Sequence, residues 1–205
     1  PALKKVLLPA YSQLIHTEEL EQLSCLIEIK EEKAEQSGQS CMEIQPSAEH
    51  QTSRGPLQLG DTAHLSIDGM GIVLFSAEVM KSVIPGSNFL TEEFTNPKQV
   101  GAHVRKGDIT AFCTGTGGDF ILWFRNGYPD SNAEKEFPVM IRLALEVRGG
   151  SLQFCDLFWL SDWNTDFPQE QILSLPDGYY HITSCTRKPE SGYWGDDQII
   201  CLYFN

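Results

Sequence analysis

The chain has 205 residues, of which 41% are hydrophobic and 21% are charged, so it can bury the core of one globular domain. Its formal net charge is −13 at pH 7. Such a surface repels nucleic-acid phosphates and attracts basic partners, although acidity can also serve solubility alone. The charge argues against direct binding of DNA or RNA. No apolar run approaches the roughly 20 residues of a membrane helix, so we expect no membrane association.

The N-terminal quarter of the chain changes character at Glu18. Residues 4–15 form an apolar stretch that Pro9 interrupts, which suits an edge strand or a bent strand. Residues 18–36 are rich in helix formers, but the alternation that begins at residues 26–29 also fits a hairpin, and both readings stay open. We therefore expect one domain over residues 1–205, with an acidic insertion at about residues 18–55.

Short apolar runs then recur at nine places, separated by turn sequences such as IDGMG, TGTGGD and VRGGS. The predicted strands are residues 64–67, 71–75, 110–113, 120–124, 137–147, 151–160, 172–175, 179–184 and 198–204. This pattern predicts an all-β sandwich or barrel. The clearest predicted hairpin joins residues 139–147 to residues 152–160. A crossover loop is expected at about residues 83–105, with one helical turn around Thr91 to Phe94.

The glycine-rich sequence CTGTGGDF, residues 113–120, superficially resembles a phosphate-binding loop. Such a loop needs a following helix, and a P-loop also needs a lysine and a serine or threonine. The sequence FILWF comes next, which is typical of a strand, and no lysine occurs before Lys135. We interpret the segment as a hairpin turn.

The cysteines and histidines show no metal-binding or catalytic spacing. The six cysteines form no C-x-x-C pair and have no clustered histidines, so no zinc site is predicted. They are typical of core residues in a reducing compartment, which favours the cytoplasm, with a disulfide framework as the alternative. No nucleophile motif singles out a histidine, so no catalytic residue and no cofactor are assigned, and whether the chain is an enzyme stays open.

Two acidic clusters, each beside aromatic residues, are the candidate binding surface. The predicted partner-binding residues are Asp156, Asp162, Trp163, Asp166, Tyr193, Trp194, Asp196 and Asp197. Aromatic side chains among carboxylates suit a basic protein partner. The alternative is that the acids are turn residues and the tryptophans are core. The acids from Asp162 to Asp166 open like a calcium loop, but Phe167 and Pro168 replace the required glycine, so no metal is predicted.

The second half of the chain resembles a known family. The segments FILWFR, PVMIRLALEVRGGSLQF and ILSLPDGYYHITSCTRKPESGYWGDDQIICLYF follow the strand and turn order of the competence-associated ComJ-like proteins. Small bacterial toxin-immunity proteins have a similar closing pattern. The resemblance implies a β-sandwich of jelly-roll type, with antiparallel strands and at most short helical turns. It also implies a protein that binds and inhibits a nuclease without catalysis of its own.

Two functional hypotheses follow. The first is a cytoplasmic, non-catalytic acidic module that binds a basic protein such as a nuclease or toxin, as an inhibitor or immunity protein. The second is a small-molecule-binding β-barrel or hydrolase whose site is assembled from distant residues such as His181, Asp156 and Asp162. A deep pocket with convergent polar groups would favour the second hypothesis. The oligomeric state is left open.

Overall fold

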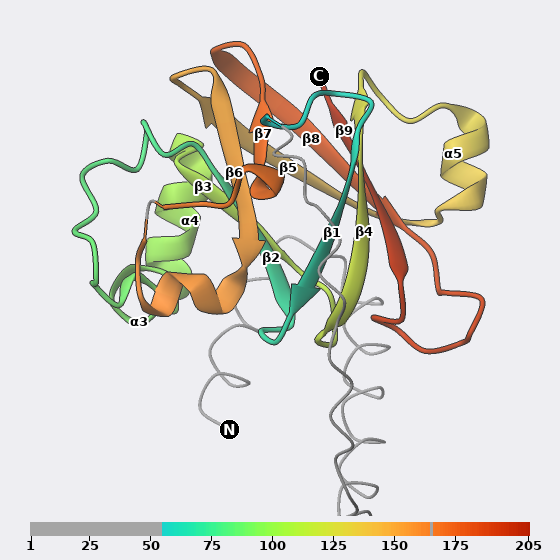
Figure 1. Ribbon diagram of the computed structural model, residues 1–205, viewed down its shortest axis with the longest axis horizontal. Coiled ribbons are helices and arrows are strands. Elements are labelled where there is room, and N and C mark those ends of the chain that lie inside the picture. Colours follow the sequence, from blue (N-terminus) through green and yellow to red (C-terminus); the bar gives the residue numbers. More distant parts are fainter. Residues whose placement is uncertain (1–54, 165) are drawn as a thin grey trace, which may run out of the picture.

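The computed structural model describes residues 55–164 and 166–205, which form two β-sheets with short helices around them (Figure 1). The predicted strand at residues 4–15 and almost all of the predicted acidic insertion lie outside the described residues. Within the described residues, nine strands lie at the nine predicted places and form two sheets, so this part of the chain is mostly β, as predicted. Jelly-roll connectivity is not confirmed by the strand order.

The first sheet has five strands in the order β1-β4-β9-β8-β5. Their bounds are β1 Thr62–Ile67, β4 Gly118–Asn126, β5 Val139–Val147, β8 Gly178–Thr186 and β9 Gln198–Phe204. All neighbours are antiparallel except β4 and β9, which run parallel. The prediction of purely antiparallel strands is therefore wrong at this pair. A direct connection makes β9 antiparallel to β8, and this direction leaves β9 parallel to β4 on its other side.

The second sheet has four antiparallel strands in the order β3-β2-β6-β7. Their bounds are β2 Gly71–Phe75, β3 Ile109–Cys113, β6 Ser151–Asp156 and β7 Ile172–Ser174. The predicted strand at residues 151–160 stops at Asp156, where the 3₁₀ helix η1, Leu157–Ser161, begins.

The predicted hairpin of β5 and β6 does not form a paired ladder. Only a single bridge joins Arg148 to Ser151, after which β5 pairs with β8 and β6 pairs with β2. Gly149 and Gly150 both have positive φ, as a tight hairpin turn requires. The turn is therefore of hairpin type, but its two strands separate into facing sheets. The glycine-rich turn at residues 114–117 likewise connects strands of different sheets, β3 and β4, and no helix follows it.

The main core lies between the two sheets. Alternate residues of β1 are buried, and Phe124 of β4 packs against Phe154 of β6 at a ring-centroid distance of 5.1 Å. Strand β2 is buried at every position because its outer face is covered too. That face carries a second cluster, to which α3, α4 and η1 contribute Phe89, Val100 and Leu160.

The connection from β2 to β3 contains two helices, α3 Phe89–Glu93 and α4 Pro97–Lys106. The predicted turn near Thr91 corresponds to α3, whereas α4, with ten residues, corrects the expectation of at most short helical turns. Its ends follow from local chemistry: the Asn96 side chain caps the first turn, Pro97 occupies the first helical position, and Gly107 closes it with φ 75°. Helix α5, Ser131–Glu136, and the 3₁₀ helix η2, Gln169–Gln171, complete the described elements.

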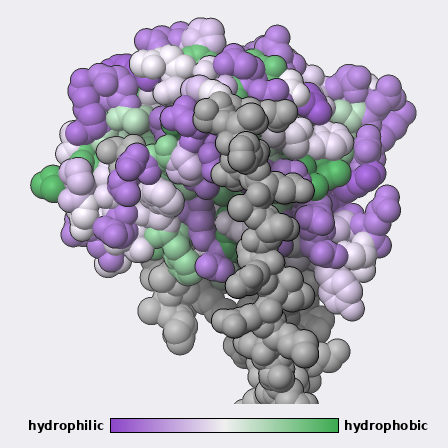
Figure 2. Space-filling view, in the orientation of Figure 1, coloured by the Kyte–Doolittle hydropathy of each residue, from purple (hydrophilic) through white to green (hydrophobic). Residues whose placement is uncertain are grey.

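In the described part of the chain, no helix has the length and apolarity needed to cross a membrane. The face shown in Figure 2 is mainly hydrophilic, with apolar residues in small separate groups.

Candidate functional site

Four connecting segments meet at one end of the sandwich, and together they bring the two acidic clusters of the sequence to the same end of the molecule. The segments are the β1–β2 turn at residues 68–70, the β3–β4 turn at residues 114–117, the chain at residues 156–166 without residue 165, and the β8–β9 loop at residues 187–197. Figure 1 shows these connections along its lower edge, opposite the β5–β6 turn. We call this region the acidic end.

Asp156 joins the first cluster to the β1–β2 turn. Its carboxylate accepts hydrogen bonds from the backbone N–H groups of Asp68 at 2.8 Å, Gly69 at 3.1 Å and Phe158 at 3.1 Å. The last of these bonds caps η1. A Cβ atom on Gly69 would lie 2.3 Å from the carboxylate, so only glycine allows this approach. Asp156 is half-buried and its carboxylate organises the backbone around it, so its chief role in the structure is local.

The loop that carries the second acidic cluster is held against the neighbouring turns by backbone contacts, several of them at glycines. The carbonyl of Gly195 accepts a hydrogen bond from Asp119 N–H at 2.8 Å, and Thr114 N–H donates to the carbonyl of Met70 at 3.0 Å. An added Cβ at Gly118 would lie 2.2 Å from the Gly195 carbonyl oxygen. The β8–β9 loop therefore lies directly on the β3–β4 turn, which in turn contacts the β1–β2 turn.

The acidic end has a strong excess of carboxylates. Its acidic residues, with those that border it, are Asp68, Asp119, Asp156, Asp162, Asp166, Glu190, Asp196 and Asp197, and all except Asp156 are exposed. Arg187 and Lys188, at the start of the β8–β9 loop, are the basic residues of these segments. Clustered negative charge makes the electrostatic potential at this end strongly negative, which attracts a cationic surface.

Two aromatic side chains project among these acids. Tyr193, one of the predicted residues, is 76% exposed, and Phe158, which the sequence analysis did not select, is 42% exposed. Trp194 is half-buried. Exposed aromatic side chains of this kind supply apolar contact area within a charged surface.

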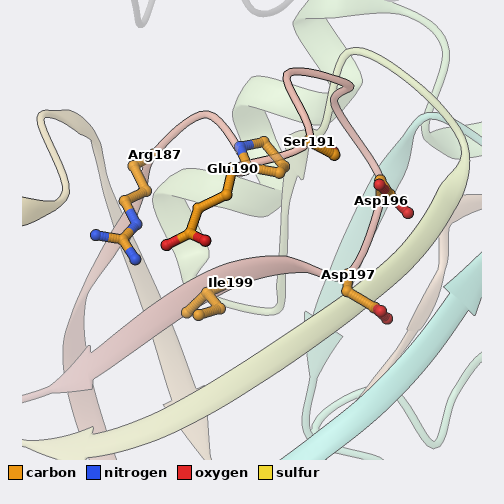
Figure 3. A pocket seen from close by; sticks show the side chains of 7 residues that line it. Arg187, Glu190, Ser191, Asp196, Asp197 and Ile199 are labelled. Atoms are coloured by element: carbon orange, nitrogen blue, oxygen red, sulfur yellow. The ribbon is translucent and has the colours of Figure 1, made fainter.

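A shallow pocket of about 290 Å³ lies beside the β8–β9 loop (Figure 3). It is lined by Arg187, Pro189, Glu190, Ser191, Asp196, Asp197 and Ile199. The Arg187 guanidinium forms an ion pair with Glu136 at 3.2 Å and lies over the Phe137 ring. Three carboxylates remain around an apolar patch, which is chemistry that suits the side chain of a lysine or an arginine.

The two tryptophans of the first cluster have different surroundings. Trp163 is 1% exposed and packs against Phe75 and Phe89, with ring-centroid distances of 5.0 and 5.1 Å. It belongs to the core and is therefore absent from the surface on which it was predicted to act. Trp159 is half-buried and stacks on Phe167.

The remaining acids of the first cluster, Asp162 and Asp166, are exposed and follow η1, which packs beside α3. Asp166 N–H donates to the Asn164 side chain at 2.9 Å, as a turn residue does. Among residues 55–164 and 166–205, no three histidine, cysteine or acidic side chains are grouped closely enough to hold a metal ion.

The residues named for a composite hydrolase site are not brought together. His181 lies near the other end of β8, where its backbone pairs with Asn205, whereas Asp156 contacts the β1–β2 turn. The seven residues of β9 separate these two ends, which corresponds to about 20 Å at the usual strand rise. Among residues 55–164 and 166–205, the strand orders are those of two open sheets and not of a closed barrel.

Asp68 and Asp119 are not among the predicted residues because each lies in a segment whose sequence indicates only a turn, and Glu190 is not among them although its loop carries the second acidic cluster. Asp119 accepts a hydrogen bond from the Ser66 hydroxyl, and Asp68 donates its N–H to Asp156. The sequence does show that several turns contain an aspartate, and these turns lie at the same end of the sandwich. This pattern becomes informative only when the strand order is known.

Comparison with solved structures finds two similar chains. One is "Crocagin biosynthetic gene J", with a TM-score of 0.40 and 17% identity over 70% of this chain and 96% of that chain. The other is ComJ from Bacillus subtilis, described as an inhibitor of the DNA degrading activity of NucA, with a TM-score of 0.40 and 13% identity over 70% and 93% of the two chains. The similarity to ComJ predicted from the strand and turn order is confirmed. No family model and no curated protein matches the sequence.

Proposed function

We propose that the chain is a non-catalytic, acidic protein-binding module that inhibits a basic nuclease or toxin, with the acidic end as its contact surface. The observation that carries this proposal is that four connecting segments with exposed carboxylates lie at one end of the sandwich, where the exposed Tyr193 also lies. The net charge of −13 has the sign that attracts a basic partner. The proposed place of action is the cytoplasm.

The mechanism of inhibition is competition for a cationic surface. A nuclease binds its substrate largely through contacts of lysine and arginine with phosphates. An acidic surface of complementary shape occupies the same side chains and keeps the nucleic acid out. The role of Tyr193 is that of an apolar anchor, and the pocket beside Ile199 receives one basic side chain of the partner.

A nuclease is the partner class to examine first, since ComJ is described as an inhibitor of a DNA-degrading activity. The experiment uses the full chain immobilised at low salt to capture its partner, followed by an assay of DNA degradation by the captured protein. The wild-type chain is then compared with Asp196→Asn/Asp197→Asn. Both side chains are exposed, so the pair tests charge rather than folding.

We expect the double variant to need about tenfold more protein for the same inhibition, because two close charges at an interface contribute on the order of 1 kcal/mol together. The matched control is Glu78→Gln/Glu134→Gln. It removes the same charge, but Glu78 lies beside Gly149 of the β5–β6 turn at the opposite end. Equal inhibition by both variants, or capture without any nuclease, would contradict the proposal.

A further inference from the structure

Two thiols face each other on neighbouring strands of the five-stranded sheet. Cys185 of β8 is the direct register partner of Cys201 of β9, and both are free cysteines. Directly opposite residues of an antiparallel pair project from the same face of the sheet. They lie there in one apolar cluster with Phe137. Of the other described cysteines, Cys155 faces Val73 across its ladder and Cys113 faces Gly71.

The backbone spacing at this pair is suitable for a covalent bond. His181 and Asn205 exchange both backbone hydrogen bonds, so by alternation Cys185 and Cys201 also form a hydrogen-bonded pair. The Cα atoms of such a pair lie about 5.5 Å apart, which is within the range found for disulfides. The Cβ atoms of this kind of pair start farther apart than in a relaxed disulfide, so closure has to draw the strands together slightly. A bond formed there is easier to reduce than an unstrained one.

Among the described residues, the apolar cluster that covers the thiols is small. Cys185 and Cys201 are 0% and 1% exposed, and their neighbours on the outer face are Phe137, Trp123 and Tyr203. Helix α5, which precedes Phe137, has no buried residue of its own. Local opening of this segment therefore exposes the thiols without breaking the main core.

We propose that Cys185 and Cys201 are a redox modification site, which forms a reversible cross-strand disulfide with an oxidant of the glutathione disulfide class. In the first step the Cys185 thiolate, having lost its proton to solvent, attacks one sulfur of glutathione disulfide and releases a glutathione thiolate. The Cys201 thiolate then attacks Cys185 Sγ, forms the Cys185–Cys201 bond and expels the second glutathione. The protein loses two electrons and two protons, and glutathione disulfide is reduced to two glutathione molecules.

Burial slows this reaction near neutral pH. It raises the pKa of Cys185 to about 11, and it raises the pKa of Cys201 to about 12, with the neighbouring Cys185 adding to the effect. Either thiol can make the first attack with the same net reaction, and each thiol attacks only after it has lost its proton. Below its pKa the thiolate fraction rises tenfold per pH unit, so the oxidation rate should rise by about the same factor from pH 8 to pH 9.

A Cys185–Cys201 disulfide would stabilise the point where strands β8 and β9 enter their connecting loop. The adjacent Thr186 hydroxyl accepts a hydrogen bond from the Gln198 side chain at 2.9 Å, and Gln198 in turn accepts one from Gly195 N–H at 3.0 Å. This network closes the loop directly beyond the cysteine pair. A covalent link there restricts the opening of the strands that carry Tyr193 and the pocket.

The test uses the full chain with Cys25→Ser, Cys41→Ser and Cys113→Ser, so that three buried cysteines remain. After exposure to glutathione disulfide at pH 9, we expect a mass decrease of about 2 Da, a Cys185–Cys201 cross-link by peptide sequencing, and its loss with dithiothreitol. Hydrogen exchange of residues 188–197 should slow several-fold in the oxidised protein. Adding Cys201→Ser should leave only a glutathione adduct, whereas adding Cys155→Ser should leave the cross-link intact.

Circular dichroism establishes that each variant is folded, and Cys201→Ala replaces Cys201→Ser if the serine variant is not. A folded protein that keeps both thiols at pH 9, a cross-link to Cys155, or unchanged exchange in the loop would overturn the proposal. None of these readouts requires a partner, so the result is independent of the proposed function.

Discussion

At the residue scale, two aspartates of the first acidic cluster have different roles. Asp156 directs its carboxylate at three backbone N–H groups, whereas Asp162 is exposed and makes no side-chain hydrogen bond to a described residue. Both are aspartates beside aromatic residues in the sequence, and their surroundings alone distinguish them. Asp156 maintains the shape of the acidic end, and Asp162 contributes charge to it.

This difference gives a prediction for Asp156→Ala. The substitution leaves the N–H groups of Asp68, Gly69 and Phe158 without their acceptor and removes the cap of η1. We expect a loss of about 2–3 kcal/mol in the free energy of unfolding, measured by urea denaturation. Asp162→Ala is the matched control and should change it by less than about 0.5 kcal/mol. Equal effects of the two substitutions would show that the Asp156 carboxylate has no organising role.

At the element scale, the β8–β9 loop contacts the β3–β4 turn through backbone atoms around Gly195. Gly195 has φ 80°, and a Cβ atom there would lie 2.5 Å from the Gly117 carbonyl oxygen. Gly192 of the same loop has φ 82° and open space around it. Both glycines therefore have a left-handed backbone conformation, which is strained for other residues. Only Gly192 has room for a side chain.

Alanine substitutions separate these two effects. Gly192→Ala should cost about 1 kcal/mol for the left-handed conformation alone. Gly195→Ala should cost about 1–3 kcal/mol more, because the loop must leave the β3–β4 turn and lose the Asp119 hydrogen bond. Urea denaturation measures both, and hydrogen exchange at residues 114–119 reports the lost contact. Similar costs for the two variants would contradict the proposed docking of the loop.

The positions of the strands were largely predictable from the sequence, whereas the strands with which they pair were not. The short apolar runs at residues 71–75 and 198–204 predict β2 and β9 with the observed bounds. Helix α4 also has signals in the sequence, namely Asn96, Pro97 and Gly107 at its ends, but asparagine, proline and glycine are equally typical of a loop. Strand β5 alternates equally well beside β6 or β8, because alternation reports which face is buried and not which strand lies alongside.

At the scale of the whole molecule, the same limit applies to the candidate site. Composition and turn chemistry identify Asp196 and Asp197 as acidic loop residues, and Tyr193 as an aromatic neighbour. Their proximity to Asp68 and Asp119 depends on β4 and β9 running parallel from one end, which is a long-range pairing. The buried position of Trp163 likewise depends on α3, which supplies Phe89. The site is a property of the assembled sheets rather than of a motif.

The central claim is that the acidic end binds a basic protein through complementary charge. The most direct measurement is the affinity of the full chain for its captured partner by calorimetry at low and at physiological salt. We expect the dissociation constant to rise at least tenfold as salt is added, mainly through slower association, because the surface charges become screened. An affinity that does not change with salt would contradict the account.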